Sequence, residues 1–139
     1  MALHDLSLYA LILQTVAECD RFAVIMKQRH DFNLADQLER ASLSIGNNFS
    51  EGYGRSATGE RLMLMFYADG SVQESKNCLL IGISRSHVTA EEARPTISKL
   101  GRISIGIIEF CASILDRDIE YRGSFRDRVE RRRAWRYRK

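Results

Sequence analysis

The C-terminal end of the chain combines residues that can bind nucleic acid. Positions 122–139 hold nine basic and two acidic side chains, a net charge of +7, whereas the other 121 residues hold 12 basic and 16 acidic ones, a net −4. A guanidinium group matches the geometry of a phosphate, and aromatic rings stack on unpaired bases. The residues expected to contact nucleic acid are Arg122, Arg126, Arg128, Arg131, Arg132, Arg133, Trp135, Arg136, Tyr137, Arg138 and Lys139.

This separation of charge points to an acidic partner for the C-terminal segment. The competing interpretation is a solvated, disordered tail without a binding role. RNA or single-stranded nucleic acid is the expected partner, because Trp135 and Tyr137 lie among the arginines. Binding of this kind weakens steeply as salt rises.

A second candidate is the stretch Gly52-Tyr53-Gly54-Arg55, which could cradle a phosphate. A dinucleotide loop requires a third glycine and a preceding strand, and both are missing here. We therefore interpret the stretch as a turn that ends a helix, because glycine accepts the left-handed backbone conformation found at helix C-termini. Arg55 could still contribute to a basic surface.

The remaining polar residues give no sign of catalysis or of a cofactor. A di-iron bundle needs Glu-x-x-His pairs on two helices, and neither these pairs nor a Gly-x-Ser-x-Gly elbow occurs in the sequence. No catalytic residue, metal ligand or cofactor is expected, and the protein is not expected to be an enzyme. Five polar residues are instead expected to hydrogen-bond one another and to fix helix register: Gln37, Arg40, Asn48, Glu51 and Glu74.

These residues must be positioned by helices, because apolar side chains recur at helical spacing along most of the chain and Pro95 is the only proline. The expected helices run over about 5–28, 33–52, 58–84 and 89–116. Asp5 or Ser7, Asn33 and Thr89 are the expected N-caps. Short connections favour an all-α, antiparallel up-down-up-down four-helix bundle over 1–118, followed by an Arg-rich extension over 119–139.

Gly70 lies in the middle of the third expected helix. A glycine there costs about 1 kcal/mol relative to alanine. We therefore expect a neighbouring helix to pack closely against it.

Three widely spaced cysteines, Cys19, Cys78 and Cys111, form no Cys-x-x-Cys pair. They are expected to be buried free thiols in a reducing compartment. The sequence also lacks a signal-peptide pattern and a run of about 18 apolar residues. A cytoplasmic protein without a membrane partner is the expectation.

Three blocks of sequence resemble a known family. They read Leu34-x-x-Gln37-Leu38-x-Arg40-Ala41-Ser42-x-Ser44-Ile45, then Asn48-Phe49-Ser50-Glu51-Gly52-Tyr53-Gly54-Arg55, then Phe66-x-Ala68-x-Gly70-Ser71-x-x-Glu74. Together they resemble the four-helix-bundle family of 23S ribosomal RNA intervening-sequence proteins, over roughly 6–115. Gly46 replaces a frequent proline, and Phe49-Ser50 a frequent Ile-Ala.

The resemblance implies an antiparallel four-helix bundle that assembles into a ring-shaped homopentamer without enzymatic activity. A related bundle is the accessory variability determinant of diversity-generating retroelements, which binds a reverse transcriptase and its RNA. The residues that carry the family motif are Gln37, Arg40, Asn48, Glu51, Gly52, Gly54, Arg55, Gly70, Ser71 and Glu74.

Two functions are compatible with this pattern. The first is a homo-oligomeric, pentameric bundle that binds RNA or single-stranded nucleic acid through its basic tail. The second is a protein-interaction scaffold or accessory subunit, for example for a reverse transcriptase.

Overall fold

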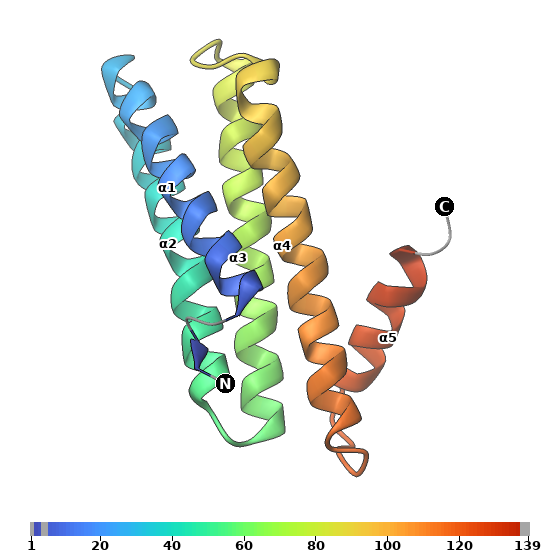
Figure 1. The fold of residues 1–139 in the computed structure, drawn as a ribbon. Coiled ribbons are helices and arrows are strands. Elements are labelled where there is room, and N and C mark those ends of the chain that lie inside the picture. The colour runs from blue at the N-terminus through green and yellow to red at the C-terminus, as the bar shows by residue number, and fades with distance from the viewer. Residues whose placement is uncertain (1, 4–5, 137–139) are drawn as a thin grey trace.

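The computed structural model describes residues 2–3 and 6–136, and the regular elements of this part of the chain are helices. They are α1 (Ser7–Gln28), α2 (Phe32–Gly54), α3 (Thr58–Ser84), α4 (Ala90–Asp116) and α5 (Phe125–Arg136). The first four lie side by side as a bundle, and α5 leans against α4 (Figure 1). The predicted all-α helical bundle is confirmed.

The core of the bundle comes from the apolar stripes that the periodicity marked. Its fully buried side chains include Leu38, Phe49, Met65, Leu79 and Ile107. The α1 helix packs on α2 and α4, and α3 packs on the same two helices. Each helix of the bundle therefore buries its stripe against two neighbours.

The N-cap expected from the sequence is found for α4 but not for α2 or α1. Thr89 and Glu92 form the expected capping box, with hydrogen bonds of 3.0 and 2.9 Å in the two directions. The N-cap of α2 is Asp31, which accepts a hydrogen bond from the amide of Leu34 at 3.4 Å, and not Asn33. The N-cap of α1 is Leu6, without a side-chain bond, and Asp5 lies outside the described residues.

The second helix ends at Gly54, as expected, but the left-handed glycine at its end and the close packing at Gly70 are both wrong. The described glycines all have negative φ, and α2 continues through Gly54 with extended Arg55 as its C-cap. A Cβ on Gly52 would lie 3.0 Å from Leu64 Cβ and 3.3 Å from the Arg61 carbonyl oxygen, so Gly52 allows α2 and α3 to approach closely. Gly70, in contrast, is exposed, and a Cβ there would meet nothing within 4 Å.

The expected hydrogen-bonded cluster of polar motif residues is also wrong. Arg40 pairs with Asp36 at 3.0 Å and Glu51 with Arg55 at 2.7 Å, both one helical turn apart on the surface. Asn48 donates to the Ser44 carbonyl and hydroxyl oxygens at 3.0 and 2.9 Å, while Gln37 and Glu74 are exposed. The polar link between α2 and α3 is instead the 3.0 Å bond from the Ser71 hydroxyl to Ser44 Oγ.

The three cysteines are buried free thiols, as expected. Burial raises the pKa of both Cys19 and Cys111 to about 12, so these thiols stay protonated at neutral pH. No helix in the described chain has the apolar length needed to cross a bilayer. Nor do its His, Cys, Asp and Glu residues gather into a metal-binding group.

Candidate nucleic-acid interface

The Arg-rich extension expected after the bundle is largely a helix that folds back onto the bundle, which contradicts the competing interpretation of a disordered tail for residues 125–136. Val129 of α5 is 1% exposed, and the Phe125 ring stacks on Phe66 of α3 with centroids 5.4 Å apart. These two apolar side chains lie four residues apart, so they share one face of α5. This short apolar stripe is the sequence feature that indicates docking on the bundle, and an argument from net charge alone overlooks it.

The turn before α5 is held by Arg126. Its guanidinium donates to the carbonyl oxygens of Asp118 at 2.9 Å and Tyr121 at 3.3 Å. A Cβ on Gly123 would lie only 2.0 Å from the Tyr121 hydroxyl oxygen, so a side chain there would displace the tyrosine. Arg126 and Gly123 therefore set the direction in which α5 returns to the bundle.

Asp69 of α3 anchors the middle of α5. Its side chain is 6% exposed and accepts hydrogen bonds from Ser104 of α4 at 2.5 Å and from Arg132 at 2.8 Å. Arg132 also donates to Ser104 at 3.3 Å. A buried carboxylate requires such partners, and here one of them comes from α5.

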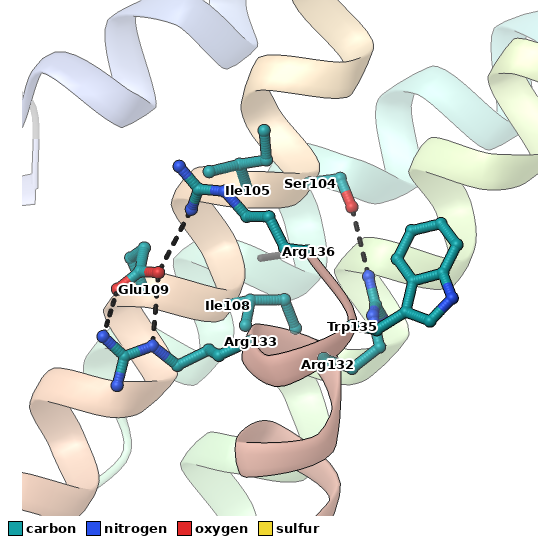
Figure 2. A pocket seen from close by; sticks show the side chains of 8 residues that line it. All are labelled: Ser104, Ile105, Ile108, Glu109, Arg132, Arg133, Trp135 and Arg136. Carbon is teal, nitrogen blue, oxygen red and sulfur yellow. Dashed lines mark hydrogen bonds and ion pairs between the residues drawn. The ribbon is translucent and has the colours of Figure 1, made fainter. Parts of the chain in front are cut away.

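Glu109 of α4 binds the last turn of α5, as Figure 2 shows. It accepts from Arg133 and from Arg136, with ion-pair distances of 3.2 Å to each. The same view shows a hollow between α4 and α5 whose lining residues include Ile105, Ile108 and Trp135.

Apart from Arg126, the arginines of residues 122–136 therefore fall into two sets. The first set binds carboxylates of its own subunit. Arg132 pairs with Asp69 of α3, and Glu109 of α4 pairs with both Arg133 and Arg136. The expectation that they are free to bind phosphates is wrong for this docked state. Tyr137, Arg138 and Lys139 lie outside the described residues.

The second set faces outward, and we call it the outer set: Arg122, Arg128 and Arg131. The Arg128 guanidinium lies 4.3 Å from the Phe66 ring centroid and 5.0 Å from that of Phe125, a cation–π contact, and no carboxylate in the described part of the chain forms a salt bridge with it. Arg131 pairs with Asp127 at 2.7 Å, but both side chains are about 70% exposed, so this pair is weak. Arg122 donates to the Ile119 carbonyl and is exposed.

Two hollows lie along α3 beside α5, and Asp69 and Arg132 line both of them. We call the two hollows together the groove. The first hollow is lined by Phe66, Gly70, Arg128 and Arg131. The second is lined by Gln73, Lys76, Gly101 and Trp135, among others. The exposed Trp135 ring, 65% accessible, thus lies along the same groove as two arginines of the outer set.

Comparison with known proteins shows to which family the bundle belongs. The family model of the 23S rRNA-intervening sequence protein matches residues 4–108. The chain belongs to this family. A solved protein of unknown function from the S23 ribosomal protein family of Bacteroides thetaiotaomicron has the same fold, with a TM-score of 0.71 and 16% identity over 75% of this chain and 97% of that one. A comparison with curated proteins found no match.

The matched region ends before α5 begins. Residues 4–108 include α1 to α3 and most of α4, whereas α5 starts at Phe125. The family match therefore accounts for the bundle, including the α3 wall of the groove, but does not extend to the basic helix α5.

Proposed function

We propose that this protein is a non-enzymatic, homo-oligomeric helical bundle that binds RNA or single-stranded nucleic acid along the groove between α3 and α5. The observation that carries the proposal is the alignment of Arg128, Arg131 and Trp135 beside an open groove. Cations that track a backbone and an aromatic ring that stacks on bases are the two parts that single-strand binding needs.

Charge supports this proposal even after the internal ion pairs are considered. Residues 122–136 contain seven arginines and two acids, a net +5. Asp69 and Glu109 of the bundle offset part of this charge, so residues 122–136 and these two partners together carry +3. Lys76 adds a further cation on the α3 side of the groove.

The shape of the groove favours an unpaired strand. Its α3 wall runs from Phe66 to Lys76, which corresponds to about 15 Å of helix. Gly70 adds no side chain to this wall, so a ligand can approach the helix backbone there. The exposed ring of Trp135 offers a stacking surface that bases inside a duplex cannot reach.

Exposed apolar residues on the first three helices support the homo-oligomeric part of the proposal. Leu13, Val24, Leu43, Tyr67 and Leu80 are each between 46% and 57% exposed. Assembly would remove such side chains from water. In a pentameric ring, as the family resemblance implies, five copies of the groove would act together and raise the affinity for a long strand.

The test is fluorescence anisotropy of a labelled single-stranded RNA with the full chain and with the double variant Arg128→Gln/Arg131→Gln. A matched control, Arg21→Gln/Arg40→Gln, removes the same charge from exposed positions on α1 and α2. Losing two phosphate contacts should lower the slope of log K against log salt by about 1.4. The control should bind like the unmodified protein.

Equal weakening in both double variants would mean that net charge alone governs binding and would reject the groove. Absence of binding at low salt by the unmodified protein would reject the nucleic-acid function altogether.

The alternative function is an accessory scaffold for a protein such as a reverse transcriptase. The same exposed apolar residues on α1 to α3 favour it, since they fit a protein surface as well as another subunit. Co-purification with such an enzyme after nuclease treatment would support the scaffold. Loss of that enzyme with the nucleic acid would support the primary proposal.

A further inference from the structure

A separate hollow lies at the end of the bundle where α2 turns into α3 and α4 ends. Three arginines line it, each from a different part of the fold: Arg55 at the C-cap of α2, Arg61 in α3 and Arg117 at the C-cap of α4. The rest of its lining is Leu6, Tyr53, Phe110, Ser113 and Ile114. It shares no residue with the groove beside α5.

The charges in this hollow are poorly compensated. Arg55 pairs with Glu51 at 2.7 Å. Within residues 2–3 and 6–136, neither Arg61 nor Arg117 has a carboxylate within salt-bridge distance, whereas Asp69 and Glu109 neutralise their arginine partners elsewhere on the molecule. Two guanidinium groups thus share one hollow without a counter-charge from the described chain.

Arg61 adds an independent observation. Its Nε is buried and has no hydrogen-bond partner, the one such side-chain atom among the described residues. A buried donor without a partner costs about 1–3 kcal/mol, more when the group is charged. Native proteins rarely keep such a group unless a water, an ion or another bound species satisfies it.

The ends of two helices give a purely structural reason for part of this arginine cluster. Arg55 and Arg117 follow the last residues of α2 and α4, where a cation is favoured by the partial negative charge of the helix end. That effect explains two of the three arginines. It does not explain Arg61, which lies in the first turn of α3, where the helix end is partially positive and a cation is disfavoured.

We infer that this hollow binds a phosphate group. Three guanidinium groups suit a phosphate dianion better than a single carboxylate, because each can donate two parallel hydrogen bonds to its oxygens. The Ser113 hydroxyl in this lining donates to the Phe110 carbonyl oxygen at 2.7 Å, so the arginines supply the donors for a phosphate, while Leu6, Phe110 and Ile114 form an apolar wall. Inorganic phosphate and a nucleoside monophosphate share this chemistry, and the wall favours the ligand with an organic part.

The test is isothermal titration of the full chain with sodium phosphate and, separately, with adenosine monophosphate, against sodium chloride at matched ionic strength. Arg117→Gln removes one cation at an exposed position and should weaken phosphate binding at least tenfold. Arg61→Gln should do the same. Arg40→Gln is the matched control and should bind like the unmodified chain.

Tighter binding of the nucleotide than of inorganic phosphate would support a role for the apolar wall. Heats that match chloride for both ligands, or equal binding by Arg117→Gln and Arg40→Gln, would overturn the inference. The Arg128→Gln/Arg131→Gln variant should bind phosphate here with unchanged affinity. Loss of binding in that variant alone would assign the phosphate to α5 instead and would also overturn it.

Discussion

Gly70 is a single position at which stability and the proposed binding should separate. It lies inside α3, is exposed, and has open space where a side chain would begin. Gly70→Ala should therefore raise the free energy of unfolding by about 1 kcal/mol, because alanine restricts the unfolded chain and fits the helix without a clash. Urea denaturation of the two proteins measures this difference.

The same position can carry a competing charge. Gly70→Glu would place a carboxylate beside Arg128 and Arg131 in the groove and should weaken RNA binding more than the neutral Gly70→Gln. Gln37→Glu makes a comparable charge change at an exposed site on α2. Equal effects of Gly70→Glu and Gln37→Glu would show that the groove has no special role.

The two glycines Gly52 and Gly70 also show how little of a glycine's structural role can be predicted from the sequence. Glycine serves helix ends, close packing and open surfaces alike, and local sequence does not say which. Gly52 faces Leu64, 12 positions away, and only the packing of α2 on α3 brings them together. Gly70 faces no residue within contact distance. Long-range packing, which periodicity does not specify, decided both outcomes.

At the scale of elements, the contact between Asp69 and Arg132 should control how firmly α5 is held. Asp69→Asn keeps an acceptor for Ser104 but removes the charge that pairs with Arg132. A hydrogen bond to a charged group contributes about 1.5–3 kcal/mol, and exposure of Arg132 reduces this to about 1 kcal/mol. Amide hydrogens of Phe125–Arg136 should then exchange about fivefold faster.

Exchange in α2 should stay the same in Asp69→Asn, because α5 packs mainly on α3 and α4. Uniform acceleration along the whole chain would show that Asp69 stabilises the bundle rather than the docking of α5. Unchanged exchange in α5 would show that Val129 and Phe125 are sufficient to hold it.

The connection between α1 and α2 should give the fold a pH dependence. Hydrogen bonds from Arg85 at 2.8 Å and His87 at 2.8 Å lower the pKa of Asp31 below its ordinary value of 3.8. A carboxyl whose pKa is lower in the folded state stabilises the fold above pH 3.8, and this contribution is lost as the pH falls through the folded-state pKa.

Asp31→Asn should therefore be less stable than the unmodified protein at pH 7, and the difference should shrink below pH 3.8. Thermal unfolding of both proteins from pH 7 to pH 2.5 measures this. A constant difference over the whole range would contradict the role of the charge and leave only the cap bond to Leu34.

The helices differ in how well they can be predicted from the local sequence. The four long helices carry repeating apolar stripes, and Thr89 and Glu92 signal a helix start within four residues. The apolar stripe of α5 consists only of Phe125 and Val129 among charged residues, so the sequence predicts an Arg-rich extension and not a docked helix. Its partners Asp69 and Glu109 lie 63 and 24 positions from Arg132 and Arg133. Docking of this kind becomes visible only when the bundle is assembled.

At the scale of the whole molecule, the proposed assembly makes a prediction about Leu43. This side chain is 57% exposed on α2. If it is covered in a homopentamer, Leu43→Glu should reduce the oligomer to smaller species, because a buried unpaired carboxylate is unfavourable. Native mass spectrometry gives the subunit number directly, and Gln37→Glu is the control on the same helix. A monomeric unmodified protein would contradict the assembly.

Crosslinking of bound single-stranded RNA followed by mass spectrometry would show whether nucleic acid lies along α3 and α5. We predict that crosslinks fall on residues 66–76 and 122–136, with Trp135 among them, and that they disappear in Arg128→Gln/Arg131→Gln. Crosslinks confined to α1 and α2, or retained in that variant, would contradict the account.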